Sequence, residues 1–188
     1  MTTAPKEDVV VLLLEQHEQI KGLIQQVESA AGEARRQPFE ELVRLLVVHE
    51  AAEEEVVHPV SRRAAVADAV VDHRLAEEGE AKQMLVDLYD MGVRHEEFGQ
   101  RFHSFALAVV EHAEMEEKEE FEQLRQRLSE DDRARLATAV RVAEAVAPTR
   151  PHTQAGESMV GNIVAGPPLA LFDRIRDALR DWRRKTEG

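Results

Sequence analysis

Apolar residues recur at steps of three and four along four long stretches of the chain, which is the spacing of amphipathic helices. The expected helices run from Asp8 to the loop at Gly32, from Pro38 to Pro59, from about Asp68 to Met91 and from about Glu96 to Leu128. Asp8 is a residue type that caps helix starts, and Gly92 one that ends them. Pro59 is expected to kink or end the second helix, because proline lacks an N–H group.

A fifth helix and a tail follow these four stretches. The segment from Glu130 to Val146 is expected to pack outside the other helices or to extend the fourth beyond a break. From Pro148 the sequence is typical of a linker, and residues 169–188 are expected to form a short amphipathic helix with an arginine-rich face. We expect that helix to dock on the bundle or to pair in a homodimer; a membrane-surface role is the alternative. The expected division is therefore 1–147, 148–168 and 169–188.

The composition narrows the fold and function classes. Aromatic residues make up only 4% of the chain, and no β-branched run alternates at period two, so the chain is expected to be all-α. The formal net charge of −13 argues against nucleic-acid binding through a basic surface. The absence of cysteine excludes thiolate chemistry and disulfides. No segment has the length of a membrane span and the N-terminus lacks a signal-peptide layout, so we expect a soluble, cytoplasmic protein.

Two segments of the chain repeat one pattern of chemistry. His49 is followed four residues later by Glu53, and His112 four residues later by Glu116. Residues four apart share a helix face, and here that face is the apolar one. A carboxylate that faces a core is costly unless something neutralises it. Two such inward pairs in one small domain therefore predict a shared metal site.

The other helices offer further ligand types on their inward faces. His17 falls in the apolar stripe of the first helix, and the stripe of the third passes through Glu77, with His73 and Glu78 near its edges. Imidazole and carboxylate ligands suit iron or manganese. The candidate metal ligands are His17, His49, Glu53, His73, Glu77, His112 and Glu116.

A ferritin-like site and a bundle without metal are the competing hypotheses for these residues. A ferritin-like di-iron site needs Glu-x-x-His on two helices, but the chain has it once, as Glu55 and His58, off the stripe of His49. A bundle without metal would hold the histidines as hydrogen-bonded core residues. Of the remaining histidines, His58 is expected to pack near a helix end and His103 to lie beside the metal site at most.

Four segments in order, EQHEQI, HEAAEEEVVHP, DHRLAEEGEAK and HAEMEEKEEF, resemble the hemerythrin-like, or HHE cation-binding, family. The resemblance covers roughly residues 8–128. It implies an up-down four-helix bundle around two non-haem iron ions with oxo or hydroxo and carboxylate bridges. The bridging carboxylates would be Glu53 and Glu116. The terminal histidines would be His17, His49, His73 and His112.

The third helix departs from the oxygen-carrying members, which place two histidines there. This chain has one, with Glu77 and Glu78 where the second would stand, and Glu50 beside His49 is a further oxygen donor. In the last helix the oxygen carriers place the carboxylate one position later, at Glu117, but Glu116 shares the face of the histidine. An added carboxylate favours the ferric state of iron.

A ferric-biased centre suits turnover of peroxide better than carriage of oxygen. The expected function is reaction with hydrogen peroxide, oxygen or nitric oxide in protection against oxidative stress, in a catalase-like cycle. Glu77 or Glu78 would act as ligand or proton carrier. The alternatives are reversible oxygen binding or storage, iron storage, and oxygen sensing through the tail.

Overall fold

The computed structural model describes residues 6–63 and 68–146 of the 188, and all regular structure within those ranges is helical. The elements are α1 (Val9–Ser29), η1 (Gly32–Arg35), α2 (Arg36–Ala52), η2 (Glu53–Val57), α3 (His58–Arg63), α4 (Asp68–Met91), α5 (Phe98–Glu116), η3 (Glu117–Phe121), α6 (Glu122–Arg127) and α7 (Glu130–Val146). The all-α prediction is confirmed. The linker and the C-terminal helix expected at 148–188 lie outside the described residues.

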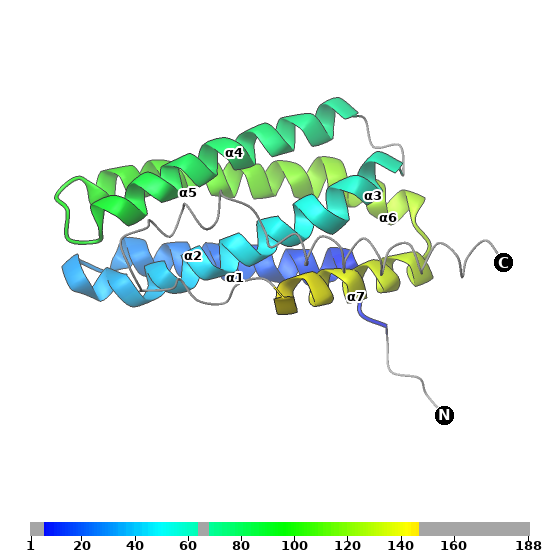
Figure 1. Ribbon diagram of the computed structural model, residues 1–188, viewed down its shortest axis with the longest axis horizontal. Coiled ribbons are helices and arrows are strands. Elements are labelled where there is room, and N and C mark those ends of the chain that lie inside the picture. The colour runs from blue at the N-terminus through cyan, green and yellow to red at the C-terminus, as the bar shows by residue number, and fades with distance from the viewer. Residues whose placement is uncertain (1–5, 64–67, 147–188) are drawn as a thin grey trace.

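The long helices form two neighbouring pairs. Figure 1 shows α1 beside α2 and α4 beside α5, and each pair is joined by a short connection at the same end of the bundle. Gly92 ends α4 with φ +74°, a conformation that favours glycine, and its N–H donates to the Leu88 carbonyl at 3.1 Å. The second and fourth long helices continue through η2 into α3 and through η3 into α6. The predicted four-helix bundle is confirmed.

The helix α7 packs outside the bundle rather than extending the fourth helix. Leu128 is extended, at φ −98° and ψ 140°, and this breaks the chain direction after α6. The Ser129 hydroxyl then accepts the Asp132 N–H at 3.2 Å, which caps the new helix. Figure 1 shows α7 running back along α1. Of the two placements expected from sequence, the outer one is therefore observed.

The core consists of two apolar clusters separated along the helices. One contains Ile20, Ile24, Phe39, Leu46, Phe98, Phe102 and Val109, and the other Val9, Leu13, Val56, Phe121, Leu124, Leu136 and Val140. Along α1, α2 and α5 alike, the residues between the two clusters include buried histidine or glutamate. The polar residues thus form a layer with apolar packing on both sides, and α7 covers the second cluster.

Both helices that carry the His/Glu pairs contain a π-helical turn at the pair. The turn η2 begins at Glu53, and η3 begins one residue after Glu116. The His58 N–H donates to the Glu53 carbonyl, five residues back, instead of four. Pro59 follows at once, so the wider turn accommodates the missing N–H and the helix continues into α3. Pro59 therefore coincides with a local widening and does not end the helix.

None of the described helices combines the length and the apolar composition that a membrane crossing needs.

Candidate metal centre

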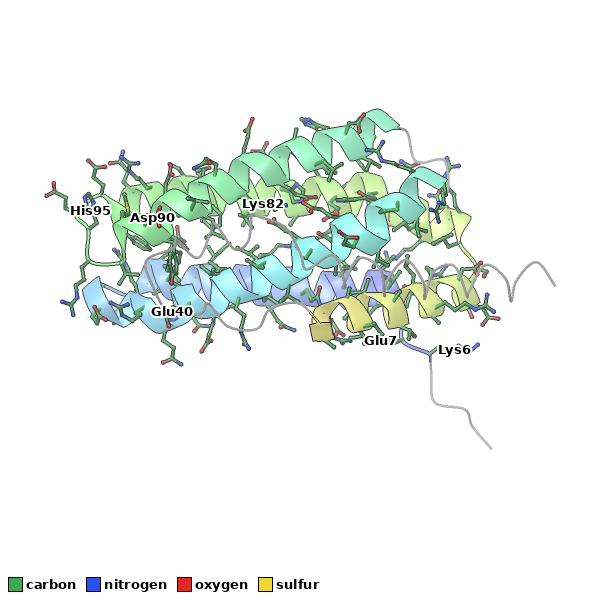
Figure 2. All side chains as sticks on the ribbon, in the orientation of Figure 1. Lys6, Glu7, Glu40, Lys82, Asp90 and His95 are labelled. Carbon is green, nitrogen blue, oxygen red and sulfur yellow. The ribbon has the colours of Figure 1, made fainter. Side chains whose placement is uncertain are left out.

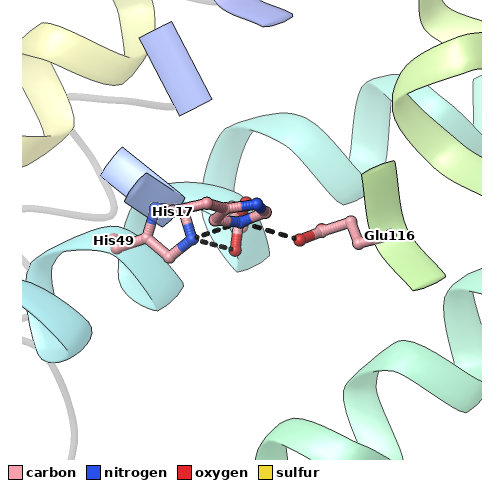
Figure 3. Close-up of side chains that lie close together, drawn as sticks. His17, His49 and Glu116 are labelled. Atoms are coloured by element: carbon pink, nitrogen blue, oxygen red, sulfur yellow. Dashed lines mark hydrogen bonds and ion pairs between the residues drawn. The ribbon is translucent and has the colours of Figure 1, made fainter. Parts of the chain in front are cut away.

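Four buried side chains from three helices converge in the polar layer. His17 and His49 are 1% and 4% exposed, and Glu53 and Glu116 are fully buried. One donor atom from each of the four lies within 4.8 Å of the others. Figure 3 shows His17 between His49 and Glu116, with Nε2 of His17 at 3.1 Å from Nε2 of His49 and 3.4 Å from Oε2 of Glu116. Nε2 of His49 lies 3.2 Å from Oε2 of Glu53.

Outer hydrogen bonds orient both imidazole rings. Nδ1–H of His17 donates to the Glu117 carboxylate at 2.9 Å, and Nδ1–H of His49 donates to the Gln16 amide oxygen at 2.8 Å. The direction of the second bond is fixed because the Gln16 amide nitrogen donates to the carboxylate of Glu144 in α7. Each ring therefore turns Nε2 toward the cluster, as metal-bound histidines do when the other nitrogen holds an acceptor.

His112 repeats this arrangement on α5. Its Nδ1–H donates to Glu77 at 3.2 Å, and Arg74 holds the same Glu77 oxygen at 2.6 Å. Nε2 of His112 is buried, has no hydrogen-bond partner within the described residues, and lies 3.9 Å from Oε2 of Glu116. Glu77 thus acts here as the outer partner of an imidazole. Its own oxygens are engaged by Arg74 and the two histidines beside it.

The donor set fits a cation. With Nδ1 of both rings protonated, the neutral tautomers of His17 and His49 face each other with two lone pairs 3.1 Å apart, so a proton or a metal ion must lie between them. Both carboxylate oxygens of Glu53 and of Glu116 are buried with no hydrogen-bond partner among residues 6–63 and 68–146. Buried carboxylates are normally paired or bound to metal.

A second buried group adjoins the first. His58 is 2% exposed; its Nε2–H donates to Glu78 at 2.7 Å and its Nδ1–H to Glu120 at 3.0 Å. Burial opposes the charged imidazole, but the two carboxylates outweigh it and raise the pKa of His58 to about 10. Donor atoms of His58, Glu116 and Glu120 lie within 4.8 Å of one another. Glu116 therefore belongs to both groups.

The buried carboxylates of this layer have few positive charges beside them. Burial raises the pKa of Glu53 well above its ordinary value, and the neighbouring charge of Glu116 adds to the effect. Burial also raises the pKa of Glu50 to about 8, although Lys82 lies 3.5 Å away and opposes the shift. Lys82, near the middle of α4 in Figure 2, also contacts Glu54. Additional positive charge would stabilise the layer.

A small cavity borders the cluster. It has a volume of about 20 Å³ and is lined by the imidazoles of His17, His49 and His112, by Glu50 and Glu78, and by apolar side chains. A space of this size holds a molecule about as large as water. The cavity therefore offers space for a small molecule beside the imidazoles of His17, His49 and His112.

The sequence-derived candidates are distributed unevenly around this centre. His17, His49, Glu53 and Glu116 come together, and His112 lies at their edge. The His73 side chain is 63% exposed and contacts Glu77 at 3.3 Å. Glu78 is buried and joins the second group through His58.

Two residues of the second group were not among the candidates. Sequence reasoning placed His58 at a helix end and did not single out Glu120. The only sequence signal was that His58 and Phe121 follow the two His/Glu pairs at the same offset. Among the other histidines, His95 lies at the far end of the bundle in the α4–α5 connection, and exposed His103 contacts Glu28.

The sequence matches the hemerythrin HHE cation-binding domain over residues 8–124. The chain therefore belongs to the hemerythrin HHE cation-binding family, a family of four-helix bundles that bind metal, typically iron. A comparison with curated proteins gives no match, and a comparison with solved structures gives none either.

Proposed function

We propose that the buried layer holds two non-haem iron ions and that the protein consumes hydrogen peroxide there, in protection against oxidative stress. The observation that carries the proposal is the set of Nε2 atoms of His17, His49 and His112, all turned toward the unpartnered carboxylates of Glu53 and Glu116. These five side chains would hold iron, and Glu116 would be shared between the ions. Bound iron supplies a Lewis acid that changes oxidation state.

The chain's own groups contribute orientation and proton handling. Glu117, Gln16 and Glu77 keep the Nδ1 protons in place, so the Nε2 atoms remain available as ligands. Glu50 lines the cavity and, with a pKa of about 8, carries a proton on its carboxyl group at neutral pH. That proton would be available to a peroxide molecule in the cavity.

The surroundings support turnover on a small molecule. The cavity of about 20 Å³ admits molecules of the size of hydrogen peroxide, oxygen or nitric oxide and excludes larger organic substrates. The layer contains more carboxylates than imidazoles: five, those of Glu50, Glu53, Glu78, Glu116 and Glu120, against the four of His17, His49, His58 and His112. Negative charge around iron favours the ferric state, which suits peroxide turnover over reversible oxygen carriage.

The test begins with iron content and the optical spectrum of the full chain after reconstitution with ferrous iron under nitrogen. We expect about two irons per chain and peroxide consumption that the His49→Gln variant lacks. The matched control is His95→Gln at the far end of the bundle, which should leave both readouts unchanged. An iron-loaded protein that consumes no peroxide would refute the activity. A stable oxygen-bound spectrum that reverses under vacuum would instead favour oxygen storage.

A further inference from the structure

The buried group around His58 adjoins the cluster of His17 and His49, and its histidine is held in the same way as the histidines of that cluster. In each of His17, His49 and His112, one ring nitrogen donates to an outer acceptor and the other faces carboxylates of the layer. In His58, Nε2–H donates to Glu78 at 2.7 Å, and Nδ1 faces Glu120 and Glu116. An outer carboxylate that holds one nitrogen is the usual support of a metal-bound histidine.

Unpartnered oxygens point to a cation at this place. Both oxygens of Glu116 and Oε2 of Glu120 are fully buried with no hydrogen-bond partner in the described part of the chain. Nδ1–H of His58 donates to the other Glu120 oxygen, Oε1, and leaves these three oxygens without a hydrogen-bond partner. An ion among these three side chains would satisfy the remaining oxygens, because hard cations accept several carboxylate ligands at once.

The π-helical turns explain how the group forms. On a regular helix, residues five apart are separated by about 140° around the axis, so Glu53 and His58 would face different directions. The turn η2 closes five residues with one hydrogen bond and brings His58 back toward the layer. In α5 and η3, Glu116 and Glu120 lie four apart and both face inward. Such turns occur frequently at functional sites.

We propose that His58, Glu116 and Glu120 form the second cation subsite of this protein, joined to the first through Glu116. Nδ1 of His58 is the nitrogen ligand, and the incoming ion displaces the proton that Nδ1 carries. Glu78 is the outer partner that keeps Nδ1 directed at the ion. This assignment rests on the proposed iron site, and in the ligand set it replaces the sequence-derived candidates His73 and Glu77.

The donors expected from sequence at that ion are placed differently. His73 is 63% exposed, whereas His58 is 2% exposed. Glu77 is engaged by Arg74 and His112.

The experiment counts Fe²⁺ ions bound per chain under nitrogen by equilibrium dialysis of the full-length protein. Mn²⁺ electron paramagnetic resonance is the second readout, because two ions that share a carboxylate couple and an isolated ion does not. We expect two ions for the wild type and one for His58→Gln and Glu120→Gln. We expect Glu78→Gln to weaken the second ion by about 10- to 100-fold. Circular dichroism verifies that each variant is folded. If His58→Gln does not fold, Glu120→Gln still tests the proposal, because glutamine keeps the shape of the glutamate side chain.

The matched controls are His73→Gln and Glu119→Gln, which change an exposed histidine and the half-exposed neighbour of Glu120. Both should keep two coupled ions. Loss of an ion in His73→Gln, together with two ions in His58→Gln and Glu120→Gln, would overturn the assignment and leave the iron site intact. A wild type that binds a single ion, which His49→Gln abolishes, would overturn it in the same way. A folded wild type that binds no ion would refute the iron site itself.

Discussion

Replacing Glu53 by methionine should stabilise the metal-free protein. The Glu53 side chain is fully buried, and neither carboxylate oxygen has a hydrogen-bond partner within residues 6–63 and 68–146. Methionine has nearly the same length and shape but no polar atom. Exchange of a buried charged group for an apolar one of similar volume commonly stabilises a protein by about 1–4 kcal/mol. For a domain of this size, each kcal/mol raises the melting temperature by roughly 2–4 °C.

The pH dependence should change in the same variant. The folded protein raises the pKa of Glu53 above its ordinary value of 4.5, through burial first and then the charge of Glu116. Above pH 4.5 the unfolded chain loses a proton that the folded state keeps, so this residue lowers stability as the pH rises toward its folded pKa. Glu53→Met removes that contribution, and the gain in stability should therefore be larger at pH 7 than at pH 4.

The assay is urea unfolding of chelator-treated protein, repeated with ferrous iron under nitrogen. Glu114→Met is the control, because Glu114 is exposed and a surface substitution should change the free energy of unfolding by at most about 0.5 kcal/mol. Iron at a hundredfold excess over its dissociation constant should add about 2.7 kcal/mol to the wild type and much less to Glu53→Met. A metal-free Glu53→Met variant that is less stable than the wild type would refute the reasoning.

Four further outcomes follow from the structure. Glu117→Gln should weaken iron binding by about 10- to 100-fold in dialysis, because the outer partner of His17 then carries no charge; unchanged affinity would contradict this role. Burial lowers the pKa of His58, but its two carboxylates raise it overall to about 10, so the metal-free wild type should lose stability in urea between pH 6.5 and about 10, and His58→Gln should lose less over the same range. Leu136→Ala should cost about 2–5 kcal/mol in urea unfolding, since Leu136 is buried between α7 and the bundle; a cost near zero would show that α7 is dispensable. Chelation should lower the melting temperature and leave the helical circular dichroism signal, and loss of that signal would show that metal is needed for folding.

Helical periodicity was sufficient to predict the bundle because the apolar stripes of the long helices are regular. The start of α4 at Asp68 and its end at Met91 agree with the prediction, and so does the α7 span from Glu130 to Val146. The inward direction of His49 and Glu53 also follows from periodicity, since His49 precedes the π-helical turn and Glu53 is its first residue. The position of α7 did not follow, because a break at Leu128 and its direction depend on packing that no local pattern contains.

Helical periodicity did not predict the second buried group, which is centred on His58. A projection at 3.6 residues per turn assumes an unbroken α-helix, and each π-helical turn shifts the register of every residue after it. His58 therefore points away from the core in such a projection and faces the core in the structure. Neighbouring carboxylates posed a second difficulty. Glu77 and Glu78 are adjacent in the sequence, and only the structure distinguishes their roles. Glu77 is the outer partner of His112, and Glu78 is the outer partner of His58.

The two apolar clusters explain how the protein tolerates so costly a layer between them. The clusters hold α1, α2 and α5 together above and below the carboxylates, and α7 adds a further apolar face to one of them. The apolar packing in these clusters stabilises the fold whether or not the layer holds a metal ion. The fold therefore has only to offset the cost of the buried carboxylates when metal is absent. Protons on His17 and His58, whose pKa values are raised by the neighbouring carboxylates against the effect of burial, supply part of the missing positive charge. A metal ion that displaces these protons would enter a layer that is already assembled, so its affinity would depend on pH.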